Sequence, residues 1–346
     1  MSGENTREYS DTKSKSGVLP VIGITMGDPA GIGAEIILKA INNSAFDGVC
    51  LPVIIGDAAF LRKTEKKLGF RSDFLEIHVG DKVPRNSNTP IIYDLDNLKE
   101  DFPIGEESAV AGRACGEYID TAVHLWKNGG IDAITTAPIN KKSLEMGGFD
   151  FPGHTEFLAY LTNTGNFAMS FFAEKLCVVL LSIHVSLRDA IEFVKKEKLI
   201  ELIRFTDDKL SKLLGKDVKI AVAGLNPHAS EFGKFGAEEA NEIIPAVSEC
   251  RDRYNINVEG PFSPDTIFLR GFQGEFDSVV SCYHDQATIA VKCLSFGSSV
   301  NVTLGLPLIR TSVDHGTAYD ISGKNMADSS SLIAAVKLAA KLFHVS

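Results

Sequence analysis

Short apolar runs rich in β-branched residues alternate with amphipathic helical runs along most of this chain. Residues 18–25 and 51–55 have the composition of buried strands, and residues 34–42 between them carry apolar side chains near helical spacing. A strand–helix–strand order is typical of a parallel or mixed sheet with helices on both faces. We therefore expect an α/β fold.

The alternation continues toward the C-terminus. We expect further strands at 133–136, 176–183, 218–224, 278–283 and 300–304, and helices at 112–128, 187–195, 237–250 and 329–342. A chain of 346 residues is longer than one compact core usually holds, so we expect two domains.

Charge and cysteine usage exclude several protein classes. The formal net charge is -10 and the basic residues form no long cluster, so we expect neither nucleic acid nor a membrane surface as a partner. The six cysteines include no C-x-x-C pair, and most lie in apolar runs, where they read as small buried side chains. This usage is typical of a cytoplasmic protein without structural disulfides.

The N-terminal segment is polar. Residues 1–17 are rich in Ser, Thr, Lys and Glu and contain no apolar signal region, and no apolar run elsewhere is long enough to span a bilayer. We expect residues 1–17 to form a disordered tail.

Three histidines follow three predicted strands. His184, His228 and His284 lie at or just beyond the carboxyl ends of the strands at 176–183, 218–224 and 278–283. Ligands of open α/β sheets bind at this edge, and three neutral imidazoles suit a divalent metal with open positions for substrate. Asp285 could orient a ligand or accept a proton. The alternative is that each histidine is an ordinary loop or core residue.

Two glycine-containing loops each precede a predicted helix. Residues 27–35 follow a strand, but their spacing is not G-x-G-x-x-G, so this loop is either a phosphate loop or a tight turn. In the second loop, 228–236, Gly233 and Gly236 would let a ligand approach the backbone near a helix N-terminus. The alternative there is an ordinary mobile loop.

Several polar residues could bind an anion. His154 and Thr155 begin a helical run, although Thr155 could instead be a simple N-cap. Lys292, Asn301 and Arg310 flank a strand near the histidine edge, where Lys and Arg bind phosphate or carboxylate well. Lys141 adds a cation after the strand at 133–136; each of these charges could equally be solvated.

Six segments together resemble one enzyme family. They are GDPAGIGAE (27–35), TAPINK (136–141), GHTE (153–156), GLNPHA (224–229), YHDQ (283–286) and NVTLGLPLIRTSVDHGTA (301–318). The chain resembles the 4-hydroxythreonine-4-phosphate dehydrogenases of vitamin B6 synthesis from about Val21 to about Ala335. It departs from the family pattern at Ala34, Ser230, Phe232 and 319–322.

The resemblance implies a fold of two α/β/α domains around a central cleft, like that of isocitrate and isopropylmalate dehydrogenases. The first domain would comprise 18–145 plus 305–346, and the second, 146–304, would carry the metal ligands and the dimer interface. It implies a homodimer with a shared active site. Its metal ligands would be His184, His228 and His284, taken from both subunits, and its substrate contacts His154, Thr155, Lys292, Asn301 and Arg310.

The implied reaction is the oxidation and decarboxylation of 4-phosphohydroxy-L-threonine to 3-amino-2-oxopropyl phosphate, in pyridoxal 5'-phosphate biosynthesis. It would use NAD or NADP and a divalent metal, zinc first, with cobalt or magnesium as alternatives. We expect Asp285 as base, Lys141 as proton donor, and Gly233, Gly236 and Asp265 at the cofactor.

Three alternatives stay open. The first is a paralogous dehydrogenase acting on 4-phospho-D-threonate or 4-phospho-D-erythronate. The second is a phosphate-handling acyltransferase, which would need no metal. The third is a non-catalytic regulatory protein, which would have no reason to keep a complete ligand set.

Overall fold

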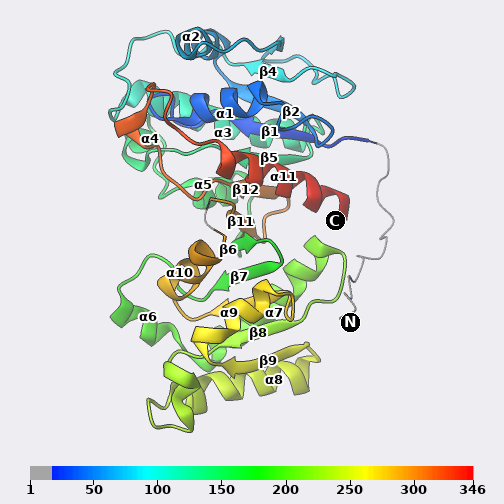
Figure 1. Cartoon of the computed structure of the whole chain (residues 1–346), viewed down its shortest axis with the longest axis vertical. Helices are drawn as coiled ribbons and strands as arrows, with labels where there is room; N and C mark the ends of the chain where they lie inside the picture. The colour runs from blue at the N-terminus through cyan, green and yellow to red at the C-terminus, as the bar shows by residue number, and fades with distance from the viewer. Residues whose placement is uncertain (1–17, 296, 346) are drawn as a thin grey trace, which may run out of the picture.

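A single mixed sheet organises the molecule. The computed structural model describes residues 18–295 and 297–345, so the predicted disordered tail, 1–17, lies outside the described residues. The sheet has 12 strands and runs along the long axis of the molecule (Figure 1). In spatial order the strands are β3 (Leu75–His78), β4 (Ile91–Asp94), β2 (Leu51–Gly56), β1 (Val21–Thr25), β5 (Ala133–Thr136), β12 (Ile309–Ser312), β11 (Val300–Leu304), β6 (Ala168–Ala173), β7 (Leu176–Leu180), β10 (Ser278–Ser281), β8 (Ile220–Ala223) and β9 (Val258–Phe262).

The sheet has two parallel parts joined by antiparallel strands. Strands β3 to β12 in this order pair in parallel, and so do β7, β10, β8 and β9. Between them, β11 and β6 pair antiparallel with their neighbours. The predicted mixed α/β class is confirmed. The predicted domain boundaries, 18–145 plus 305–346 and 146–304, stay a prediction.

The helices pack on this sheet as amphipathic layers. Their bounds are α1 (Gly33–Asn42), α2 (Ala58–Leu68), α3 (Ala109–Lys127), α4 (Lys141–Met146), α5 (His154–Leu161), α6 (Leu187–Phe193), α7 (Lys196–Leu214), α8 (Ile244–Tyr254), α9 (Pro264–Phe272), α10 (His284–Leu294) and α11 (Ser330–Val345), with 3₁₀ helices η1 (Pro227–Glu231) and η3 (Tyr319–Ile321) and a π turn η2 (Glu239–Ile243). Alternate residues of β7 face different cores: Cys177 and Val179 pack with α7 and α8, and Val178 with α9 and α10. Because side chains of a strand alternate between faces, helices cover both faces there, as predicted.

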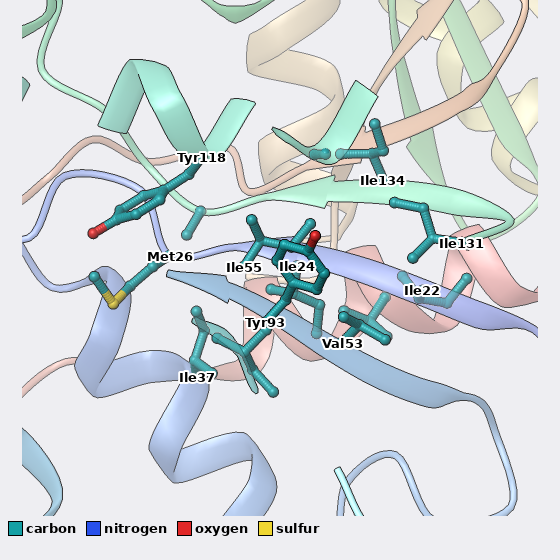
Figure 2. Packing of buried hydrophobic residues seen from close by; sticks show 14 of the residues in the cluster. Ile22, Ile24, Met26, Ile37, Val53, Ile55, Tyr93, Tyr118, Ile131 and Ile134 are labelled. Carbon is teal, nitrogen blue, oxygen red and sulfur yellow. The ribbon is translucent and has the colours of Figure 1, made fainter. Parts of the chain in front are cut away.

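The core of the first part of the sheet is built from β-branched strand residues. Ile22 and Ile24 of β1 and Val53 and Ile55 of β2 are completely buried, and Tyr118 of α3 closes the same cluster (Figure 2). Burying each such aliphatic side chain contributes about 1.5–3 kcal/mol. This rigid platform holds the loops that follow β1 and β5.

One predicted element has a different form. The helix expected at 237–250 is interrupted: it starts as the π turn η2 and becomes regular only in α8. Pro245 occupies the first turn of α8 and has no N–H to donate to the preceding turn, which explains the change of hydrogen-bond spacing. None of the helices in the described part of the chain combines the length and apolarity that a bilayer crossing requires.

Candidate active site

A buried guanidinium is the electrostatic centre of the site. Arg310, on β12, is 2% exposed; its Nη1 donates to Thr303 Oγ1 at 3.0 Å and its Nη2 to Thr136 Oγ1 at 2.8 Å. Its Nε is buried without a partner. Among the described residues, no carboxylate lies within 4.0 Å of its nitrogens. A buried charge held only by hydroxyls is destabilising by several kcal/mol in order of magnitude, so this position is suited to receiving an anion.

Arg310 remains charged although it is buried. Desolvation lowers the pKa of Arg310 to about 10, while the carboxylate of Glu156 on α5 opposes that shift. A pKa of about 10 still leaves the guanidinium protonated at neutral pH. Arg310 is therefore a permanent cation in a water-poor position.

His154 lies within the field of this cation. It is the first residue of α5, and its Nε2 is out of solvent and has no hydrogen-bond partner, although other atoms of the residue remain partly exposed. Desolvation, and then the charge of Arg310, holds the pKa of His154 well below its ordinary value of 6.5. The imidazole is therefore neutral and can either donate to or accept from a ligand.

Thr155 and Asn301 complete this group. Thr155 Oγ1 lies 3.4 Å from Thr303 Oγ1, which in turn accepts from Arg310. The alternative of Thr155 as an N-cap is wrong, because Gly153 holds that position without any side-chain bond. Asn301 precedes Thr303 by two residues on β11, hence on the same face, and its Oδ1 is buried and unpartnered. The structure thus brings together four of the five predicted substrate residues.

A cavity of about 160 Å³ opens beside this group. It is lined by Thr136, Lys141, Gly153, His154 and His315, among others. Lys141 is the first residue of α4, is exposed and lines the same cavity as His154; its role as proton donor stays a prediction. The fifth predicted substrate residue, Lys292, is exposed on α10 and is not among the described residues that line this cavity.

The three predicted metal ligands lie at the ends of three adjacent strands. β10 pairs in parallel with β7 up to Leu180 and with β8 up to Val222, so the loops carrying His184, His228 and His284 leave one edge of the sheet. The rings of His184 and His284 are 6.0 Å apart. His284 Nδ1 is 2.8 Å from Asp285 Oδ1, which leaves His284 Nε2 free for a ligand.

His228 lies in an unusual turn. Residues 228–232 all have positive φ values, between 44° and 67°, and none is glycine. This left-handed turn costs roughly 1–2 kcal/mol per residue.

Gly233 and Gly236 follow this turn with φ values of 90° and 141°, and α9, which carries Asp265, packs against it. Asp265 accepts from Ser263 Oγ at 2.6 Å. The cofactor contacts predicted for these three residues stay a prediction.

The three imidazoles are not gathered into a compact cluster within one chain. In the described ranges, only Glu76, His78 and Asp94 bring three ligand atoms within 4.8 Å of one another; the first two lie on the edge strand β3 and the third on its buried neighbour β4. Imidazoles remain a donor set that fits a divalent ion, and their placement on neighbouring strand ends suits a shared site.

Sequence reasoning overlooked three polar residues of the site. Thr136 and Thr303 hold the guanidinium, and Glu156 is the carboxylate whose charge acts on it. All three lie inside the motifs TAPINK, GHTE and NVTLGLPLIR. The roles of Thr136 and Thr303 depend on the pairing of β5, β12 and β11, and that of Glu156 on the packing of α5, which no local pattern reveals.

Residues 48–339 match the family model described as pyridoxal phosphate biosynthetic protein PdxA. The chain belongs to the PdxA family. It is 44% identical over 328 residues to the D-threonate 4-phosphate dehydrogenase of Cupriavidus necator, covering 94% of this chain and 98% of that protein. Crystal structures described as 4-hydroxythreonine-4-phosphate dehydrogenases are similar too: that from Klebsiella pneumoniae at 39% identity with a TM-score of 0.85, and that from Burkholderia phymatum at 41% with 0.81, each covering 94% of this chain and 99% of that one.

Membership in the PdxA family confirms the resemblance stated from the motifs, and it confirms the predicted enzyme class, a dehydrogenase. The acyltransferase and the non-catalytic protein are therefore set aside. The names of the relatives divide between the two substrates that the motifs left open.

Proposed function

We propose that this PdxA-family protein oxidises and decarboxylates a small 4-phosphorylated hydroxy acid, with D-threonate 4-phosphate as its substrate. The observation that carries this is the buried guanidinium of Arg310, which has only hydroxyl partners at 2.8 and 3.0 Å. Such a group requires an anion, and phosphate and carboxylate are the anions whose geometry matches a guanidinium.

The chain's own residues bind and orient this substrate. Arg310 and His154 would hold one of its two anionic groups, and Thr155 and Asn301 would supply further hydrogen bonds, since Asn301 Oδ1 is buried without a partner. Holding both ends of a short molecule fixes the carbon that loses hydride, which accelerates the reaction by orientation. Lys141, on the wall of the same cavity, would donate a proton.

The reaction balances without further reactants. The hydroxyl on the carbon β to the carboxylate would lose a proton and that carbon a hydride, for which NAD or NADP would supply the acceptor. The resulting β-keto acid releases carbon dioxide, and a proton, for which Lys141 is our candidate donor, replaces it. A divalent ion held by His184, His228 and His284 would lower the pKa of the hydroxyl and stabilise the enolate that decarboxylation leaves. Asp285 would orient His284 through the 2.8 Å contact and is our candidate base.

Zinc is our first choice of metal, because imidazole ligands with an open position suit it, with cobalt or magnesium as alternatives.

We also propose a homodimer. Lys292 and the three histidines do not form a complete site in one chain, and Val185, Leu187 and Ile191 beside His184 are 43%, 59% and 39% exposed. A partner subunit covering this edge would complete the ligand set. A cytoplasmic location is part of the same proposal.

The substrate choice rests on the relatives. The curated relative that we report at 44% identity is named for D-threonate 4-phosphate, while the structures at 39–41% are named for 4-hydroxythreonine 4-phosphate. The two acids differ at one carbon, which bears a hydroxyl in the first and an ammonium group in the second. The second substrate, 4-phosphohydroxy-L-threonine, is therefore the alternative function.

Side-by-side turnover decides between them. NADH or NADPH formation is measured with each acid, with and without chelator and re-added zinc, cobalt or magnesium. We expect kcat/KM for D-threonate 4-phosphate to exceed that for the amino acid at least about tenfold, and dihydroxyacetone phosphate to accumulate. The reverse ranking would select the alternative. No metal-dependent turnover of either acid would overturn the proposal.

A further inference from the structure

A directional chain of hydrogen bonds lies behind the Lys141 side of the cavity. Tyr319 donates its hydroxyl proton to Asp28 Oδ2 at 2.6 Å. Tyr319 Oη is also 3.0 Å from Ser143 Oγ, and because its single proton goes to Asp28, the serine hydroxyl must be the donor in that contact. Ser143 Oγ in turn accepts the Ser108 backbone N–H at 3.2 Å. Each bond in such a chain polarises the next.

The chain of bonds joins four segments that are distant in the sequence. Asp28 is in the loop between β1 and α1, Ser143 in α4, Tyr319 at the start of η3, and Ser108 caps α3. The α3 and α4 backbones touch directly, since a Cβ on Gly112 would lie 1.6 Å from the Ser143 carbonyl oxygen. The Tyr319 hydroxyl thus connects the glycine loop to α4, beside a weaker interaction of Asp28 with the Ser143 side chain.

The Asp28 carboxylate depends on this arrangement. It is 1% exposed, and no cation among the described residues lies within 4 Å of it. Burial raises its pKa, and the hydrogen bond from Tyr319 is the largest effect opposing that rise. Its other oxygen accepts the Ala30 N–H at 2.8 Å. The Ser143 side chain and the Asn140 backbone lower the pKa of Asp28 by smaller amounts, so removing the tyrosine hydroxyl would take away the strongest side-chain hydrogen bond of this buried carboxylate.

The same segments carry the cavity wall. The Asp28 N–H donates to the Pro138 carbonyl at 3.0 Å, and Asn140 caps α4 by accepting the Ser143 N–H at 2.8 Å. Lys141 lies between these two anchor points and lines the cavity with His154. The position of its backbone is therefore set on one side by Asp28 and on the other by Ser143.

We propose that Tyr319 is a positioning residue, whose hydroxyl holds Lys141 in place against the Arg310 and His154 side of the site. The role in turnover rests on the proposed function. The two hydrogen bonds that hold the Arg310 guanidinium come from Thr303 and Thr136 and not from Tyr319, so we expect anion binding there to be independent of Tyr319. A misplacement of about 1 Å in a reacting group can cost about a hundredfold in rate.

Kinetics of Tyr319→Phe test this role against a matched control. Tyr93→Phe is the control, because Tyr93 is also a buried tyrosine with a bonded hydroxyl. It lies on β4, away from the cavity, is 4% exposed, and accepts the Gly80 N–H at 3.0 Å. We expect Tyr319→Phe to lower kcat at least about tenfold, with KM and inorganic phosphate affinity within about twofold of wild type. Tyr93→Phe should change none of these. An unchanged kcat, or a parallel loss of phosphate binding, would overturn the positioning role.

A chemical measurement tests the same inference without turnover. The acetylation rate of Lys141 in the intact protein is measured by mass spectrometry, with exposed Lys66 on α2 as internal reference. We expect Tyr319→Phe to change the Lys141 rate at least about threefold and Tyr93→Phe to leave it unchanged. Equal Lys141 rates in all three proteins would refute the inference. If the wild type turns over neither acid, the proposed function fails while this measurement still decides the role of Tyr319.

Discussion

The Arg310 group and the histidine edge differ in how complete each is within one chain. Arg310 is 2% exposed and already has two hydroxyl partners from β5 and β11. His184 and His284 approach only to a ring separation of 6.0 Å, and His228 lies in an exposed left-handed turn. The first site is preorganised by strand pairing. The second site has its donor atoms on neighbouring strand ends. In our proposal, an ion and a partner subunit are needed to complete it.

The largest expected effect concerns the open site. His228→Ala removes one imidazole from the proposed metal shell, and we expect kcat/KM to fall at least about a thousandfold, because a bound ion contributes several kcal/mol to the transition state. Metal content after dialysis and turnover with re-added zinc are the measurements. Since His228 is exposed, the variant removes no buried packing, and it should remain folded by circular dichroism.

Asp285→Asn should weaken the same proposed metal site to a smaller extent. It keeps the shape beside His284 but weakens the 2.8 Å contact, so a smaller loss of metal affinity, about ten- to a hundredfold, is expected. If His228→Ala keeps the activity of the wild type after chelation, the histidine edge is not a metal site. The contrast between the two sites would then not hold.

The next effect concerns the preorganised site. Arg310→Met should lower kcat/KM about a hundredfold, because an anion loses a charged partner in a water-poor position. The same variant should unfold at a higher temperature than wild type in the absence of ligand, because an uncompensated buried charge is removed. Differential scanning fluorimetry with and without inorganic phosphate checks both statements.

Arg310→Lys is the matched control. It keeps the charge but loses the planar geometry that contacts Thr136 and Thr303, so phosphate binding should be intermediate. If phosphate stabilises Arg310→Met as strongly as wild type, the guanidinium is not the anion site.

The smallest effect is a pH dependence. Burial and Arg310 hold the folded-state pKa of His154 below its unfolded value of about 6.5. Protonation then favours the unfolded chain, so the stability linked to His154 is fully present above pH 6.5 and is lost as pH falls below it. Between pH 7.5 and 5, the melting temperature of wild type should fall more than that of His154→Gln, by on the order of 2 °C.

His124→Gln is the control for this slope, because His124 is exposed on α3. It should follow the wild-type curve. Identical slopes for wild type and His154→Gln would show that the His154 imidazole is not desolvated in solution.

Much of the site could be predicted because strand ends are visible in local patterns. His184, His228 and His284 follow apolar runs, and the parallel pairing of β7, β10 and β8 places them on one edge. Thr136 and Thr303 could not be predicted as guanidinium partners, because their role depends on β12 lying between β5 and β11. Thr155 was open to an N-cap interpretation, since a cap depends on backbone angles that Gly153 adopts.

The sequence alone determined the alternating elements, the mixed α/β class, the family and the residue types at the strand ends. It could do so because hydrophobic periodicity and contiguous motifs are local properties. Only the tertiary structure decided that Arg310 is buried without a carboxylate, that His154 is neutral, and that Tyr319 joins Asp28 to Ser143. Desolvation and long-range hydrogen bonds depend on what packs around a group, and the residues that do so here are separated by as many as 291 positions.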